Sequence, residues 1–155
     1  MVARPTVLSD GIIDLILERD IPADGRPWSP SSDFRICLHA TGERVGGISL
    51  RTGNSRFLRM YAGHIGYGVL PGHRGHRYAA RACRLLRPLA VARGMDVLWI
   101  TCNPDNIASR RTCEIVGARY VETVDVPPDT ELYQRGETRK CRYRWELQSE
   151  RNRHE

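Results

Sequence analysis

The pattern of apolar and polar positions along the chain predicts a mixed α/β domain. Alternating or continuous apolar runs predict strands at residues 12–17, 34–39, 45–50, 57–70, 97–102, 120–126 and 141–147. Helical spacing of apolar residues predicts helices at 76–93 and 106–116. Gly94 and Gly117 follow these helices and end them, and Pro88 predicts a kink in the first.

Two segments without such a pattern predict loops. Residues 20–33 hold three prolines and three serines, and residues 127–139 are polar. The order of elements is therefore strand, hairpin, long strand, helix, strand, helix and two strands. This order predicts a sheet of mixed direction with helices between its central strands, in one domain over residues 1–147 with a frayed tail at 148–155.

Length and charge narrow the class of protein. A chain of 155 residues is long enough for one full core. It has no apolar run near the roughly 20 residues of a membrane span, and no signal-peptide pattern, so we expect a cytosolic protein without membrane contact. The net charge is +6, and every basic residue except Lys140 is an arginine. GC-rich coding bias is the simpler explanation, and the alternative is a surface that favours phosphates. The scattered positions of the arginines favour a phosphate-bearing small ligand over a nucleic-acid face.

The cysteines predict neither disulfides nor a metal site. There are five, an odd number, and none is spaced C-x-x-C. We therefore expect reduced, mostly buried thiols.

The segment 63–80, GHIGYGVLPGHRGHRYAA, is the richest in candidate chemistry. A predicted strand runs through a loop of glycine and basic residues into a helix. Backbone N–H groups at such a helix start, together with the helix dipole, are typical of a pyrophosphate site. Arg74 and Arg77 can add charge-assisted hydrogen bonds. The alternative is a solvated basic turn.

The segment 101–111, TCNPDNIASRR, opens the second helix after the central strand. Asn106 can cap this helix. Asn106, Arg110 and Cys113 are spaced to share one helix face. The alternative is a plain cap followed by solvated arginines.

Together these segments resemble the GNAT superfamily of acyl-CoA-dependent N-acetyltransferases, over roughly residues 34–147. The family motif R/Q-x-x-G-x-G/A follows a strand that ends V-x-P, and here Val69-Leu70-Pro71 precedes the segment Arg74 to Ala79. Arg74 and Ala79 match, whereas Arg77 replaces the central glycine. The pair Asn106-x-x-Ser109 and the closing Gly117 also match the family layout.

The resemblance implies acetyl-CoA as donor and a sheet whose central strands splay apart to hold it. Its pyrophosphate would bind the segment formed by His73, Arg74, Gly75, His76, Arg77, Tyr78 and Ala79. Its pantetheine arm would lie beside Val69 and Leu70 and would contact Asn106 and Ser109. Arg110 would belong to the same cofactor-binding site. An amine acceptor would attack the thioester directly, and the backbone amide near Val69 would hold the oxyanion.

The catalytic acid and base are harder to assign. Family members with a general acid usually carry tyrosine at the position of Cys113, which makes this cysteine a candidate donor. No acidic residue lies between Glu43 and Asp96, so His64 is the candidate base. A water chain, or a structural histidine bonded to a loop carbonyl, is the alternative. Gly66 and Gly68 share a predicted face with His64 and would leave a trough for the acyl group.

One departure concerns the acceptor side. The family usually places two helices between its first two strands, but residues 18–33 are too short and too rich in proline for both. With this first helical pair reduced or missing, we expect an exposed apolar sheet face, covered in a homodimer with residues 20–33 or 127–139 near the interface.

Three functions stay open at this point. The first is an N-acetyltransferase acting on an amine. The second is a non-catalytic CoA-binding or interaction module. The third, an RNA-binding domain, is disfavoured because the chain has few aromatic residues for stacking on a basic strand face.

Overall fold

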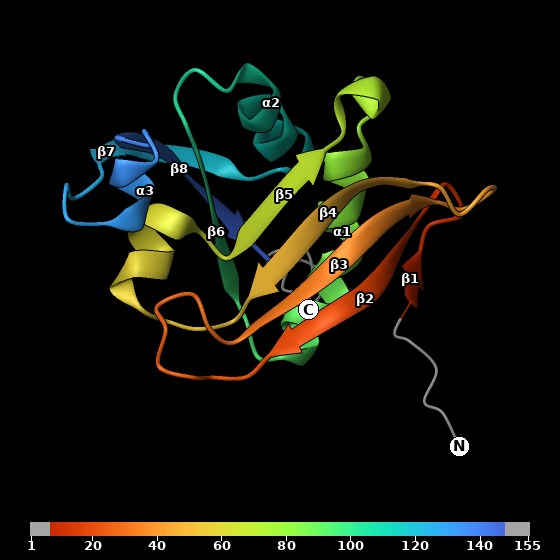
Figure 1. Ribbon diagram of the computed structural model, residues 1–155, viewed down its shortest axis with the longest axis horizontal. Helices are drawn as coiled ribbons and strands as arrows, with labels where there is room; N and C mark the ends of the chain where they lie inside the picture. Colours follow the sequence, from red (N-terminus) through yellow and green to blue (C-terminus); the bar gives the residue numbers. More distant parts are fainter. Residues whose placement is uncertain (1–6, 148–155) are drawn as a thin grey trace, which may run out of the picture.

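The computed structural model describes residues 7–147, and they form two antiparallel sheets (Figure 1). The first sheet has five strands in sequence order, namely β1 (Val7–Ser9), β2 (Ile13–Ile21), β3 (Ser31–Leu38), β4 (Arg44–Arg51) and β5 (Ile65–Val69). The second has three strands in the order β6 (Val97–Cys102), β8 (Arg139–Glu146) and β7 (Arg119–Asp125). The frayed tail predicted at 148–155 lies outside the described residues.

Helices connect and cover these strands. They are the π-helical turn η1 (Leu58–Ala62), the 3-10 turn η2 (Pro71–His73), α1 (Tyr78–Ala92), α2 (Ile107–Val116) and α3 (Glu131–Gln134). Helix α1 links β5 to β6 and lies behind the five-stranded sheet in Figure 1. None of the helices in residues 7–147 is long and apolar enough to cross a membrane.

The central strands β5 and β6 are neighbours without being hydrogen-bonded as a ladder. β5 pairs only with β4, and β6 pairs only with β8. The prediction of a mixed α/β fold with splayed central strands is therefore confirmed. The missing first helical pair is also confirmed, because residues 22–30 link β2 to β3 without a helix.

The core lies between α1 and one face of the five-stranded sheet. Strand alternation sends the buried apolar side chains to that face, and α1 meets them with small and branched residues. These core residues include Ile13, Leu15, Phe34, Ile36, Ile48 and Leu50 from the sheet, and Ala82, Leu86 and Ala90 from α1. The helix thus buries the whole apolar side of β2 to β4.

The opposite face of this sheet is mainly polar, which corrects one expectation. Asp33 and Arg35 alternate with the core residues of β3, and Ser49 and Arg51 do so on β4. Asp33 accepts two hydrogen bonds from Arg19 of β2, at 2.8 and 3.0 Å. The expected exposed apolar face is therefore wrong. The homodimer stays a prediction, now without that support.

The predicted long strand at 57–70 is interrupted, because its first part coils into η1. The hydroxyl of Ser55 accepts the N–H of Leu58 at 3.1 Å and so starts this turn. Gly63 ends it at φ 79°, and a Cβ there would lie 3.1 Å from both Trp99 O and Thr101 N. The predicted loop 127–139 likewise contains a helix, α3, whose first turn is capped by the hydroxyl of Thr130.

Substitution of Gly63 tests this interruption. Gly63→Ala adds a Cβ against the β6 backbone in a conformation that L residues rarely adopt, so we expect the free energy of unfolding to fall by about 2–3 kcal/mol. Urea unfolding at neutral pH measures it. Gly68→Ala is the matched control, because its Cβ would meet no atom within 4 Å, and it should cost less than about 1 kcal/mol. Equal losses in the two variants would contradict the assignment.

Candidate functional site

His64 joins the two sheets at one end of the gap between β5 and β6. Its backbone N–H donates to Trp99 O at 2.7 Å, and the N–H of Trp99 donates back to the ring Nδ1 at 2.9 Å. With Nδ1 acting as acceptor, the ring carries its proton on Nε2, which donates to Gly53 O at 3.2 Å. The sheets are therefore fastened at His64 and open beyond it.

This geometry favours the structural alternative for His64. Both ring nitrogens are engaged with backbone groups, the residue is only 2% exposed, and it is not among the residues that line the cavity described below. Burial lowers the pKa of His64 to about 4, so the ring is neutral at pH 7 and holds no free acceptor for an amine proton. A role for His64 as the base has no support in these contacts.

The gap has unpaired backbone groups on both sides. Leu70 N–H bonds to Val45 O, and Arg51 N–H bonds to His64 O. Antiparallel alternation then turns the backbone groups of Tyr67 and Val69 away from β4 and towards β6. The carbonyl of Val69 accepts Arg74 Nε at 3.1 Å, whereas its N–H has no partner among the described residues. An extended ligand can add to this edge like a strand.

The segment predicted to bind an anion follows β5 and leads into the start of α1. Gly75 has φ 91°, and Arg77, the N-cap, sits in the left-handed region at φ 61° without a side-chain cap. The first turn of α1 contains no acidic residue. Its free N–H groups and the helix dipole therefore offer partial positive charge to an anion.

The other residues proposed for this segment lie around the same turn. His73 Nε2 is 3.5 Å from a carboxylate oxygen of Glu43, and His76 stacks on Tyr78 with ring centroids 5.3 Å apart. Leu70 is exposed, and Ala79 is buried in the first turn of α1. The structure thus brings the predicted pyrophosphate segment together at one end of the gap.

Across the gap, α2 is tied to β5. Asn106 Oδ1 accepts the N–H of Ser109 at 3.1 Å, which is the predicted helix cap. The Ser109 hydroxyl lies 2.7 Å from the hydroxyl of Tyr67, which also contacts Ser109 O at 3.2 Å. Arg110 instead turns to β8, where its Nε donates to the Tyr143 hydroxyl at 3.1 Å. Asn106 and Ser109 therefore face the site, and Arg110 supports the wall behind it.

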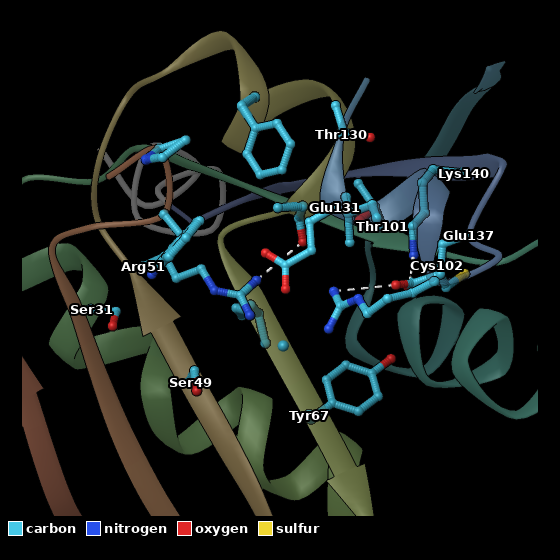
Figure 2. A pocket seen from close by; sticks show the side chains of 18 of the residues that line it. Ser31, Ser49, Arg51, Tyr67, Thr101, Cys102, Thr130, Glu131, Glu137 and Lys140 are labelled. Atoms are coloured by element: carbon cyan, nitrogen blue, oxygen red, sulfur yellow. Dashed lines mark hydrogen bonds and ion pairs between the residues drawn. The ribbon is translucent and has the colours of Figure 1, made fainter. Parts of the chain in front are cut away.

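A cavity of about 770 Å³ adjoins the gap on the side opposite α1 (Figure 2). It is lined from β3, β4, β5, β6, α2 and α3, and by the ring-bearing residues Trp28, Phe57 and Tyr67. Asn106 and Ser109 belong to this lining, whereas the segment 73–79 does not. The cavity and the anion site thus lie at opposite ends of β5.

The cysteine proposed as proton donor is separated from this cavity. Cys102 lines the cavity, and Cys113 is fully buried without being part of the lining. A hydrogen bond with Cys113 lowers the pKa of Cys102, and the same contact, with burial, raises the pKa of Cys113. All five cysteines are buried free thiols. Cys102, which the sequence analysis did not single out, is a lining residue of the cavity, and its thiol contacts that of Cys113.

The cavity also holds carboxylates that the sequence did not point to. Asp33 comes from β3, whereas Glu131 and Glu137 come from α3 and the turn that follows it. Glu137 is held by the buried Lys140 at 2.8 Å and by Arg135 at 3.3 Å. Glu131 has no side-chain hydrogen bond or ion pair within residues 7–147. Only an N-cap threonine, Thr130, followed by the acidic Glu131 in the first turn signals this helix in the sequence.

The pH dependence of stability tests the structural role of His64. Unfolded His64 takes up a proton below its ordinary pKa of 6.5, whereas the folded residue does so only near 4. The free energy of unfolding should therefore fall by up to about 3 kcal/mol as the pH drops through that window.

Variants of His64 separate this effect from other groups. His64→Ala should lose about 2–3 kcal/mol at pH 7, because Trp99 N–H loses its acceptor, and should show a flatter pH dependence. His64→Asn keeps an acceptor without titrating, so its loss at pH 7 should be smaller. Urea unfolding at pH 7 and pH 5 measures both. An unchanged pH slope in His64→Ala would refute the structural role.

One known protein family matches most of the chain. The family model described as an acetyltransferase (GNAT) domain matches residues 13–119. A search of curated proteins finds no significant match.

Solved structures show the same fold at low sequence identity. A GNAT-family acetyltransferase from Bacillus anthracis is 19% identical, with TM-score 0.58, and the match covers 76% of this chain and 67% of that one. The microcin C7 self-immunity acetyltransferase MccE, in complex with acetyl-CoA and AMP, is 17% identical with TM-score 0.58, over 75% of this chain and 61% of that one. A protein from Chromobacterium violaceum, described as a probable GNAT-family acetyltransferase, reaches TM-score 0.64 at 14% identity, over 94% and 88%.

The family match covers more than half of the chain, and it includes the strands that flank the gap and the segment that leads into α1. The resemblance found in the sequence is thereby confirmed, and the chain belongs to the GNAT acetyltransferase family.

Proposed function

We propose that this protein transfers the acetyl group of acetyl-CoA to the nitrogen of an amine. The observation that carries the proposal is the unpaired edge of β5, which runs from the cavity to the uncapped start of α1. One ligand can then place a phosphate group at α1 and an acyl group beside the cavity. Similar folds are known with acetyl-CoA or with coenzyme A bound, in MccE and in the ribosomal-protein acetyltransferase RimL.

Different residues of this chain would bind different parts of acetyl-CoA. The amides of residues 73–79 would bind the pyrophosphate, helped by the guanidinium of Arg77. Val69 and Leu70 would pair with the pantetheine arm, and Asn106 and Ser109 would contact it from α2. The free N–H of Val69 would hold the carbonyl oxygen as negative charge develops on it.

The reaction needs a neutral amine. Its lone pair attacks the thioester carbon, and the C–S bond of the tetrahedral intermediate breaks to give the amide and the CoA thiolate. One proton leaves the nitrogen, and one proton neutralises the thiolate. Of the carboxylates in the cavity, Asp33 and Glu137 are held in ion pairs. We therefore assign Glu131 to receive the amine proton, directly or through water, in place of His64.

The experiment that tests this function is a screen of primary amines with acetyl-CoA. We expect free thiol to be released only when acetyl-CoA and an acceptor are both present, with the acetylated product identified by mass spectrometry. Acetyl-CoA that raises the Tm without any product from the amine panel would instead support the CoA-binding module. Salt-dependent retention of RNA without an effect of acetyl-CoA would support the RNA-binding alternative.

The unusual Arg77 gives a second test. A non-glycine residue at φ 61° carries a conformational cost of about 1–2 kcal/mol, partly offset by the lower entropy of its unfolded chain. Arg77→Gly should therefore keep or slightly raise the free energy of unfolding, while it weakens acetyl-CoA binding about 3–10-fold by removing a phosphate partner.

Calorimetric titration with acetyl-CoA and urea unfolding measure the two effects separately. Arg84→Gln is the matched control, because this substitution removes the same charge from α1. The Arg84 guanidinium donates to Ile115 O on α2 and lies away from the proposed phosphate site. If Arg77→Gly bound acetyl-CoA as well as the wild type, the guanidinium would have no role in phosphate binding.

A further inference from the structure

The Arg51 side chain at the end of β4 extends into the acceptor cavity from its sheet side (Figure 2). Its Nη1 donates to the carbonyls of Ala62 and Gly63, at 3.1 Å each. These two bonds use both hydrogens of Nη1 and fix the plane of the guanidinium. The Nε–Nη2 edge has no hydrogen-bond partner within residues 7–147, which leaves two parallel N–H donors free.

The charge of Arg51 has no partner of opposite sign in contact. No carboxylate in the described part of the chain lies within 4.0 Å of its nitrogens. The charge of Asp33 favours the charged form of Arg51, but Arg19 and Ser49 already contact this carboxylate, at 2.8 and 2.6 Å. Burial and the neighbouring Arg135 lower the pKa of Arg51, so its charged form is under-stabilised here. A ligand anion would supply the missing charge.

Gly66 provides the room that this arrangement needs. A Cβ at Gly66 would lie 2.7 Å from Arg51 Nη2. The trough expected at Gly66 is therefore filled by the guanidinium, whereas Gly68 remains open. This glycine allows the free edge of Arg51 to lie against β5, on the cavity side of the strand.

The size and remaining lining of the cavity limit the acceptor. About 770 Å³ encloses a small molecule but not a folded partner. Trp28 and Phe57 provide an apolar wall, and Glu131 provides a carboxylate for a cationic amine. We propose that the Nε–Nη2 edge of Arg51 binds a carboxylate of the acceptor, so that the substrate is a small amine bearing a carboxylate and an apolar body. This inference rests on the proposed function.

Matched amines test the substrate class. Phenylalanine, phenylalaninamide and O-phosphoethanolamine are compared as acceptors, by kcat/KM for thiol release from acetyl-CoA. We expect phenylalanine to exceed its amide by about 10–100-fold, because a bidentate charge-assisted pair is lost in the amide. Preference for O-phosphoethanolamine over phenylalanine would assign the edge to phosphate instead. Equal values for phenylalanine and its amide would overturn the proposal.

Two variants connect this preference to Arg51. Arg51→Gln should reduce the phenylalanine-to-amide ratio to about 1–3, mainly through the KM for phenylalanine. Arg51→Gln also loses bonds to the end of η1, so Gly66→Ala is the second variant. It keeps the charge and the Arg51 side chain but crowds the guanidinium, most closely at Nη2, and it should reduce the ratio about 3–10-fold. Arg44→Gln, on the same strand but outside the cavity, should leave the ratio unchanged.

A binding measurement separates this proposal from acetyl transfer itself. Phenylacetate at millimolar concentration should raise the Tm of the wild type more than phenylacetamide does, and this difference should vanish in Arg51→Gln and shrink in Gly66→Ala. If no amine is acetylated but this difference appears, the proposed function fails and the carboxylate site stands. If amines are acetylated but neither the difference in Tm nor the preference in kcat/KM appears, the carboxylate site fails alone.

Discussion

The contact between His64 and Trp99 determines where the two sheets meet, and the rest of the site depends on it. His64, which directly precedes β5, makes two hydrogen bonds to the backbone of Trp99 in β6. Its N–H donates to Trp99 O at 2.7 Å, and its ring Nδ1 accepts Trp99 N–H at 2.9 Å. Beyond this point β5 and β6 make no ladder, and each strand pairs only along its other edge, β5 with β4 and β6 with β8. The unpaired groups of Val69 and Thr101 then face the gap. Unpaired backbone groups that are partly shielded from water are costly, and a ligand that pairs with them lowers this cost.

The absence of a first helical pair changed the chemistry of the sheet rather than exposing its core. With no helix to cover them, β2 to β4 carry charged residues on that face, such as Glu18 and Arg35, and keep their apolar residues under α1. The proline-rich segment 22–30 is short enough to bend over the end of the sheet and to place Trp28 in the cavity wall. The cavity is thus lined by loops and α3 as well as by the sheet, and its charged residues come both from the sheet and from the segment 131–137.

Local patterns predicted most of the fold, and contacts between distant segments account for the failures. Alternation and helical spacing located the strands around α1 and α2 because a half-buried element must repeat its apolar face. The same alternation misled at residues 57–62, where η1 forms because Gly63 must pass close to Trp99. The segment proposed to bind pyrophosphate is contiguous in sequence, so its pattern could be recognised there. Arg51, Glu131 and Cys102 meet only through the tertiary fold, so no spacing could have marked them.

The prediction for His64 also failed to anticipate contacts between distant segments of the chain. Its position near the expected active site suggested a base, but what decides its chemistry is Gly53 on one ring nitrogen and Trp99 on the other. Neither contact has a signature in sequence. Only the alternative of a histidine bonded to a loop carbonyl, which the sequence left open, agrees with these contacts.

The abundance of arginine acquires a structural meaning beyond charge. Several guanidinium groups bind the carbonyls of chain segments that no ladder satisfies: Arg142 binds Arg59 O at the η1 turn and stacks on Trp99 at 4.0 Å, and Arg84 binds Ile115 O of α2. A lysine side chain has a single ammonium nitrogen. It could not bind such a carbonyl and at the same time present two parallel N–H donors to a ligand. Arg51 has this capacity, since one nitrogen fastens the end of η1 and the opposite edge stays free. The same bonds that position the turn therefore pre-organise a planar donor pair in the cavity, and the entropy of ordering that side chain is already spent before an acceptor arrives.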